Sequence, residues 1–233
     1  MGLEGRVVVV TGATGGLGRT AARAFAERGA SLVVVGTNQA RLAELVADLR
    51  LPVDRTLAHA ADLRDEAAAG RLAQAVIDRF GRVDVLLQLV GGWVGGKELA
   101  ETDSADLTAM LDQHVWTTWR LLQAFVPRLV AGRWGRVLVV SSPSAWQPAG
   151  KGGPYAAAKA AEEALLLTVA QETRGSGVTA NVIQVRAIDE EHKRQPGSSA
   201  ATPEEIVAGI LYLCSDEGGI VSGARVPLTA GAA

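Results

Sequence analysis

The chain has 233 residues, 48% of them apolar, and its 23 basic and 25 acidic side chains give a formal net charge of −2. This balance argues against a nucleic-acid-binding surface and against a disordered chain. No apolar run reaches the roughly 18–20 residues that span a bilayer, and the first six residues lead straight into an apolar run, so we expect neither a membrane segment nor a signal peptide. One cysteine and three scattered histidines exclude an internal disulfide framework and give no metal-ligand spacing. We therefore expect a cytoplasmic protein that binds no metal.

Short apolar runs alternate with longer segments rich in alanine, leucine and arginine along the whole chain. The runs predict strands at residues 7–10, 31–35, 56–60, 83–90, 136–140, 178–185 and 224–228. The segments between them predict helices at residues 17–28, 39–49, 66–80, 106–129, 155–173 and 203–213. Most of the strands are continuously apolar, as expected for strands that helices cover on both faces.

This alternation predicts an α/β fold with a parallel, doubly wound sheet and right-handed crossovers. Because no linker or change of composition interrupts it, we expect a single domain over residues 1–233. Gly29 and Gly81 stand where helices should end, and Thr202-Pro203-Glu204-Glu205 indicates a helix start. Ligands of such sheets bind beyond the carboxyl ends of the strands, so the residues that follow each strand are the functional candidates.

A glycine-rich turn, Thr11-Gly12-Ala13-Thr14-Gly15-Gly16-Leu17-Gly18, follows the first strand and opens the first helix. Glycine lets a backbone approach a ligand closely, and the positive end of a helix attracts a pyrophosphate. The alternative is an ordinary turn in a chain that holds 27 glycines. The position between strand and helix favours a dinucleotide phosphate site.

Tyr155 and Lys159 are four residues apart and so lie on one face of a predicted helix. A neighbouring ammonium favours the phenolate form of tyrosine, which makes Tyr155 a candidate general acid for carbonyl reduction, or base for alcohol oxidation. Ser142 follows the fifth predicted strand and can donate to a carbonyl oxygen on which negative charge develops. The alternatives are an exposed tyrosine–lysine pair and a loop serine, a residue that turns favour.

These motifs resemble those of the short-chain dehydrogenase/reductase family: Thr-Gly-x-x-x-Gly-x-Gly near the N-terminus, Tyr-x-x-x-Lys, and a serine 13 residues before the tyrosine. The resemblance extends from Gly5 to Leu228. It implies a Rossmann fold of seven strands and an NAD(P)-dependent oxidoreductase that interconverts a carbonyl and an alcohol on a small-molecule substrate. It also implies a homodimer or homotetramer.

The resemblance implies which residues hold the cofactor, with Lys159 on the nicotinamide ribose and Asp62 on the adenine amino group. Asp62 could also cap the next helix, since capping residues are common there. The second strand is followed by Gly36-Thr37-Asn38, without the acidic residue that would repel a 2′-phosphate, which tilts our expectation from NAD towards NADP. The implied cofactor-binding set is Gly12, Thr14, Gly16, Leu17, Gly18, Thr37, Asp62, Gly91, Tyr155, Lys159 and Ile188.

Three stretches depart from the family pattern. The family's Asn-Asn-Ala-Gly motif is replaced here by Gln88-Leu89-Val90-Gly91. A family asparagine that helps hold a water on a proton path is replaced by His114. A neutral imidazole both donates and accepts, so we count His114 as a catalytic candidate, with a packing role as the equal alternative.

The third departure follows the sixth strand, where Val185-Arg186-Ala187-Ile188-Asp189-Glu190 lacks the family's Pro-Gly. There Glu190 replaces a frequent threonine, while the backbone of Ile188 can still meet the carboxamide. The polar segment 189–201 indicates a solvated loop or a modest lid over a wide site. Together the departures leave a second hypothesis, a nucleotide-binding sensor or partner subunit with weakened catalysis.

Tryptophan supplies five of the ten aromatic side chains. Trp93 and Trp146 follow the fourth and fifth predicted strands, which places both at the carboxyl edge of the sheet. We expect them to help wall a flat, apolar substrate pocket. Ordinary loop packing is the alternative for each.

Overall fold

One sheet of seven parallel strands forms the centre of the protein, which is described by a computed structural model over residues 2–195 and 197–228. The strand order is β3-β2-β1-β4-β5-β6-β7, so the order reverses between β1 and β4. The doubly wound parallel sheet predicted from the sequence is confirmed. The strands are β1 (Val7–Thr11), β2 (Ser31–Gly36), β3 (Thr56–Ala60), β4 (Val85–Gln88), β5 (Gly135–Ser141), β6 (Val178–Val185) and β7 (Arg225–Leu228).

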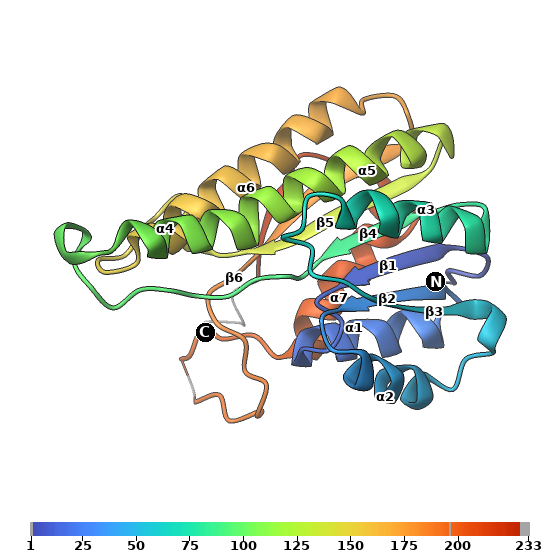
Figure 1. Cartoon of the computed structure of the whole chain (residues 1–233), viewed down its shortest axis with the longest axis horizontal. Coiled ribbons are helices and arrows are strands. Elements are labelled where there is room, and N and C mark those ends of the chain that lie inside the picture. The colour runs from blue at the N-terminus through green and yellow to red at the C-terminus, as the bar shows by residue number, and fades with distance from the viewer. Residues whose placement is uncertain (1, 196, 229–233) are drawn as a thin grey trace.

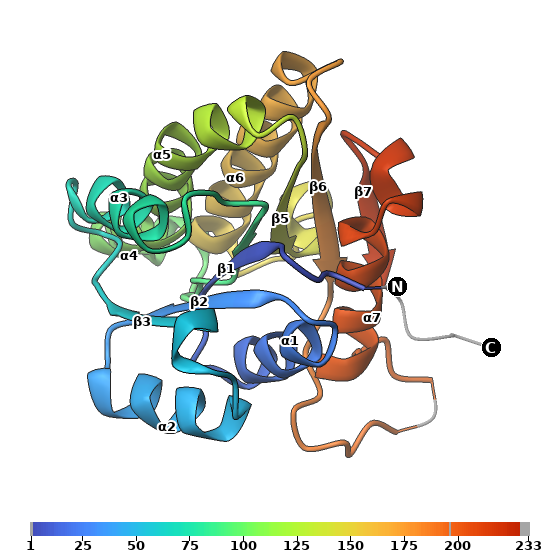
Figure 2. The same ribbon diagram turned by 90° about the vertical axis from the view of Figure 1, so that its right-hand side faces the viewer.

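Helices cover both faces of the sheet (Figures 1 and 2). On one face lie α1 (Gly16–Glu27), α2 (Gln39–Leu49) and α7 (Pro203–Cys214). On the other lie α3 (Ala68–Phe80), α5 (Thr117–Ala131) and α6 (Gly153–Glu172), with α4 (Ser104–Met110) leading into α5. No helix among the described residues is both long and apolar enough to cross a membrane.

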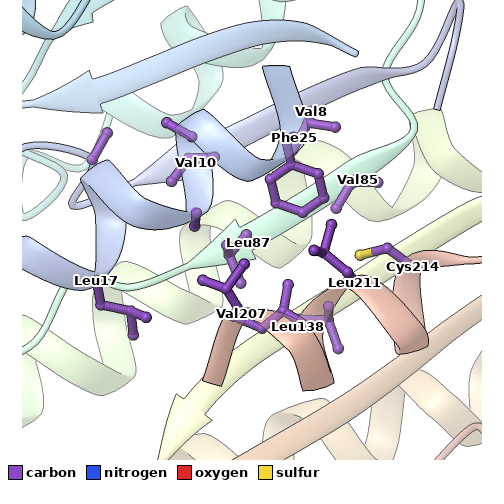
Figure 3. Close-up of a cluster of buried hydrophobic side chains, with 14 of the residues drawn as sticks. Val8, Val10, Leu17, Phe25, Val85, Leu87, Leu138, Val207, Leu211 and Cys214 are labelled. Atoms are coloured by element: carbon purple, nitrogen blue, oxygen red, sulfur yellow. The ribbon is translucent and has the colours of Figure 1, made fainter. Parts of the chain in front are cut away.

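The two faces of the sheet bury alternate residues of each strand. In β1, Val8 and Val10 pack towards α1 and α7, whereas Val7 and Val9 pack towards α3 and α5. Both sets are buried, which explains why the strands are continuously apolar instead of alternating. Figure 3 shows how side chains of strands and helices meet on the first face: Val8, Val10, Leu17, Phe25, Val85, Leu87, Leu138, Val207, Leu211 and Cys214.

The helix predicted over residues 106–129 differs from the expectation in one respect. The chain is helical there, but a π-helical segment, Leu111–Trp116, separates α4 from α5. The wider turn is closed by Thr117, whose backbone N–H and hydroxyl both donate to the carbonyl of Asp112. It leaves His114 buried, and π-helical turns of this kind are frequent at functional sites.

The helix ends follow the sequence closely. Gly29 and Gly81 adopt φ values of 85° and 72°, the left-handed conformation that closes a helix. The start of α7 is a capping box, in which Glu205 N donates to the Thr202 hydroxyl at 3.3 Å and Thr202 N donates to the Glu205 carboxylate at 2.8 Å.

Removing this cap should cost about 1 kcal/mol. Thr202→Ala is expected to lower the free energy of unfolding by that amount in urea titrations, because the N–H of Glu205 loses its partner. Thr168→Ala is the matched control, since Thr168 is exposed in α6 and its hydroxyl only bonds back to Ala164 O. Equal destabilisation by the two substitutions would contradict the role given to the cap.

Candidate active site

The glycine loop joins the carboxyl end of β1 to α1, at the point where the strand order reverses. Gly12 has a φ of 63°, and a Cβ atom there would lie 3.0 Å from the backbone of Leu89 after β4. A Cβ atom on Gly18 would overlap the carbonyl oxygen of Gly12 and lie 2.7 Å from the Cα atom of Ala13. Glycine at these two positions lets the loop, the start of α1 and the β4 turn pack backbone against backbone.

Two cavities of about 330 and 410 Å³ adjoin along the carboxyl edge of the sheet and share the glycine loop and the turn 89–91. The first extends to Tyr155, Lys159 and Ile188, and the second to Thr37 and Asp62. Every residue predicted to hold the cofactor lines one or the other. The loop at the centre and the two arms suit an extended dinucleotide whose pyrophosphate lies at the N-terminus of α1.

Tyr155 and Lys159 lie on the first two turns of α6 and line the first cavity. The Lys159 ammonium is 6.0 Å from the centre of the Tyr155 ring. Lys159 is buried, and its Nζ donates to the carbonyl of Val140 at 2.9 Å and to the carboxylate of Glu162 at 2.7 Å. The protein thus fixes two of the three N–H donors of this ammonium and leaves one for a ligand in the cleft.

His114 lies beside this pair, with its ring edge-on to Tyr155 at 5.7 Å between ring centres. Its Nε2 is 3.0 Å from the carbonyl of Gly92, which can only accept, so Nε2 carries the proton. Burial, reinforced by the charge of Lys159, lowers the pKa of His114 to about 4 and keeps the imidazole neutral near pH 7. The buried Nδ1 atom has no hydrogen-bond partner among the described residues.

Ser142 directly follows β5 and caps a short 3-10 turn, Pro143–Ala145, by accepting from Ser144 N at 3.2 Å. α6 packs against this turn, which brings the serine close to the helix that carries Tyr155 and Lys159. Ser142 is buried, however, and Val140 and Ser141 of the same segment line the cavity in its place. A hydroxyl reorientation would be needed before Ser142 meets a substrate, since its Oγ now donates to the Ser144 hydroxyl at 3.2 Å.

Gln88 replaces the family's asparagine, and both its amide oxygen and its amide nitrogen form hydrogen bonds. Its Oε1 accepts from the Thr11 hydroxyl and from Val90 N, and its Nε2 donates to Thr118 Oγ1 at 3.2 Å. The departure in sequence therefore preserves the turn between β4 and the cleft, because one long amide spans the distance between β1 and α5.

The second cavity is lined by Asp62, whose carboxylate accepts from the backbone and the side chain of Arg64. The hydrogen bond from the Arg64 side chain is the main cause that lowers the pKa of Asp62. The alternative cap for the next helix is wrong, because α3 begins only at Ala68. Asn38 is engaged elsewhere, since its side chain accepts from Arg41 N as the cap of α2.

The segment after β6 places a negative charge over the glycine loop. A Cβ atom on Gly16 would lie 2.5 Å from the carboxyl carbon of Glu190. Neighbouring Ile188 forms an isolated β-bridge with Ala201. The two hydrogen bonds of this bridge join Ala201 to the carbonyl of Ala187 and to the N–H of Asp189, so the N–H and the carbonyl of Ile188 take no part in it. His192 and Arg194 are attached to α7, His192 by a contact with Glu204 at 2.8 Å and Arg194 by an ion pair with Glu205.

Trp93 and Trp146 lie in the loops after β4 and β5, which extend past the same end of the sheet (Figure 1). The two loops are joined by a bond from Gly96 N to Lys151 O at 2.8 Å. Both tryptophans are more than 60% exposed and neither lines the two cavities described above. Trp146 is anchored by a 3.3 Å bond from its Nε1 to Gln184 of β6.

Sequence reasoning did not single out Glu162, the acidic partner of Lys159. Glu162 is completely buried, and burial raises the pKa of its carboxyl group. The only signal available in the sequence is its spacing of three residues from Lys159 on one helix, which solvent-exposed pairs share.

A glycine loop at the switch point of a doubly wound sheet, with a tyrosine–lysine pair across the cleft, defines a dinucleotide-binding α/β protein with groups for proton transfer. Residues 6–199 match the family model of the short chain dehydrogenases. The chain belongs to the short-chain dehydrogenase/reductase family of NAD(P)-dependent oxidoreductases.

Individual relatives are similar over nearly their whole length. The (2S)-[(R)-hydroxy(phenyl)methyl]succinyl-CoA dehydrogenase subunit BbsD of Thauera aromatica is 28% identical, with 96% of this chain and 94% of the relative covered. An uncharacterized NAD-dependent oxidoreductase of Mycobacterium tuberculosis is 29% identical, covering 99% and 96%. The crystal structure of a short chain dehydrogenase from Bacillus anthracis superposes with a TM-score of 0.89 at 26% identity, covering 97% and 96%.

Proposed function

We propose that the protein interconverts a carbonyl and an alcohol on a small, apolar substrate, with Tyr155 as the general acid or base. The observation that carries this proposal is that Tyr155 and Lys159 line the same cleft as the glycine loop. When bound, the nicotinamide cofactor supplies or accepts the hydride. Tyr155 then gives a proton to the substrate oxygen in reduction or takes one in oxidation, and Lys159 turns its remaining N–H towards the ligand.

Ser142 is proposed to donate to the substrate oxygen as negative charge develops there. His114 is proposed to assist by holding the turn at Gly92 and the edge of the Tyr155 ring in place. The loops joined between Gly96 and Lys151 carry Trp93 and Trp146, which supports a substrate region with aromatic walls above the cleft. The phenyl group in the printed name of the relative from Thauera aromatica supports testing aromatic substrates first.

For the cofactor we propose NADP in preference to NAD, because Gly36-Thr37-Asn38 has no carboxylate to repel a 2′-phosphate. The relative from Mycobacterium tuberculosis, named NAD-dependent, favours the other choice. We further propose a cytoplasmic homodimer or homotetramer. The half-exposed Trp116, which directly precedes α5, and Trp119, in its first turn, support such an interface.

The test is to titrate the protein with NADH and NADPH by fluorescence and then to screen diketones, quinones and aromatic ketones for turnover. Nucleotide binding followed by oxidation of the bound nucleotide is the expected result. Nucleotide binding without turnover of any carbonyl or alcohol would favour the second candidate, a nucleotide-binding sensor or partner subunit. The position of Glu190 over the glycine loop is the observation that favours this alternative.

Glu190 also gives a prediction for affinity. Glu190→Gln is expected to tighten NADH and NADPH binding by roughly two- to fivefold, because it removes a negative charge from the helix end where the pyrophosphate binds (about 0.3–1 kcal/mol). The gain should shrink as salt is added. Glu191→Gln is the control, since Glu191 is exposed and pairs with Lys193. An equal gain in both variants would show that overall charge, and not the position of Glu190, sets the affinity.

A further inference from the structure

The catalytic lysine of this chain has a buried acidic partner on its own helix. Glu162 lies three residues after Lys159 on α6, has no exposed surface, and accepts from Lys159 Nζ at 2.7 Å. Lys159 is itself 4% exposed, so water screens neither member of the pair. Burial raises the pKa of Glu162, and the Lys159 ammonium and the Thr118 hydroxyl oppose that shift by favouring the carboxylate. The ionised carboxylate opposes the field that the ammonium exerts on its surroundings.

Glu162 is also held in place by the neighbouring helix α5. Its Oε1 accepts from the Thr118 hydroxyl of α5 at 2.8 Å, and Thr118 in turn accepts from the Gln88 amide at the end of β4. The chain of bonds continues to Thr11 at the start of the glycine loop. Because each donor has a defined direction, the position of Lys159 is coupled to the two strand ends that border the cleft.

The groups that face Glu162 come from three elements. Lys159 and Glu163 lie on the same helix, His114 lies on the π-helical segment with its Nδ1 3.9 Å from Glu162 Oε2, and Thr118 lies on α5. Of these only Lys159 brings an ammonium group that bonds directly to Glu162. Glu163 points elsewhere, because its carboxylate accepts from Gln184 of β6 and pairs with Arg225 of β7.

We propose that Glu162 is a positioning residue that holds Lys159 in the cleft and, by opposing its charge, sets the pH at which Tyr155 exchanges its proton. The inference rests on the proposed function of Tyr155, since the proton of that hydroxyl is the one transferred. Glu162 itself lines neither of the two cavities. It acts through the direction and the effective charge of the ammonium.

The test measures the ionisation of the Tyr155 hydroxyl directly, in the nucleotide-free protein. The chain has two tyrosines, so the ultraviolet absorbance of tyrosinate, corrected with Tyr155→Phe, follows Tyr155 alone. In Glu162→Gln the ammonium loses its opposing charge, and the midpoint of this titration is expected to fall by about 1 pH unit. The midpoint of the pH profile of kcat/KM should move by the same amount in the same direction, and KM for the nucleotide should rise because Lys159 loses a fixed partner.

Glu163→Gln is the matched control, since it removes an equally buried carboxylate from the next position, and its titration should stay at the wild-type midpoint. An unchanged midpoint in Glu162→Gln, or the same shift in both variants, overturns the proposal. If Glu162→Gln does not fold, Thr118→Val replaces it. That variant removes one hydrogen bond that favours the carboxylate form, so a smaller shift of the same sign is expected and no shift overturns the proposal. Absence of turnover in the wild type would instead refute the proposed function, which the absorbance titration does not require.

Discussion

Replacing Tyr155 by phenylalanine is expected to lower kcat by about 10²- to 10⁴-fold, the usual contribution of a positioned general acid or base. The ring keeps its edge-on contact with His114, so the change removes the hydroxyl and little else. Nucleotide affinity should change far less, since the glycine loop and Lys159 remain in place. Turnover and fluorescence titration of the same preparations separate the two effects.

Tyr212→Phe provides the matched control for this experiment. Tyr212 is the only other tyrosine of the sequence, and it is half-exposed on α7, a helix on the opposite face of the sheet from α6. Its loss should leave kcat unchanged. A Tyr155→Phe variant that keeps more than about a tenth of the wild-type kcat would remove Tyr155 from the chemistry and point to another proton donor at the cleft.

Gly18→Ala is expected to lower the free energy of unfolding by about 1–3 kcal/mol, the usual cost of forcing an added methyl group into a packed site. The new Cβ atom would meet the backbone of Gly12 and Ala13, which cannot swing aside as a flexible side chain does. The loop must move away from α1, so nucleotide binding should weaken in the same variant. Urea titration and fluorescence titration measure the two effects.

The control variant, Gly70→Ala, is expected to change the free energy of unfolding in the opposite direction. Gly70 occupies the same position of α3 that Gly18 occupies in α1, the third residue of the helix, but nothing lies within 4 Å of a Cβ atom built there. Gly70→Ala should therefore stabilise the protein by roughly 0.5–1 kcal/mol, because alanine loses less backbone freedom in a helix. Destabilisation by both substitutions would mean that glycine is needed for a reason other than close packing of the loop.

The sequence alone was enough to predict the sheet. The predicted strands at residues 56–60 and 178–185 agree with β3 and β6 at both ends, because polar or glycine-containing turns border each of these strands. The start of α7 at Pro203 could also be predicted, since a capping box is a local sequence pattern. The position of the glycine loop, Tyr155 and Lys159 on one cleft follows from the order of strands and helices, which local patterns define.

Features that depend on distant neighbours could not be predicted. Hydrophobic periodicity over residues 106–129 does not reveal the π-helical turn at His114, whose imidazole bonds to the carbonyl of Gly92, 22 residues earlier in the chain. Glu162 resembles a surface residue in sequence, and it is buried because Thr118, 44 residues earlier in the chain, offers it a donor. Glu190 lies over Gly16 through a loop whose path no pattern of glycine or proline defines.

The carboxylate of Glu190 also bears on the rate of turnover. Because the Glu190 carboxylate lies over Gly16, we expect a nucleotide to displace this carboxylate from the loop as it binds, which offsets part of the electrostatic gain. The same exchange works in reverse, because a carboxylate tethered a few ångströms away competes for the loop as the nucleotide leaves. In many enzymes the release of a product, and not the chemical step, limits the rate. A site that binds its cofactor less tightly in this way is then expected to release it faster.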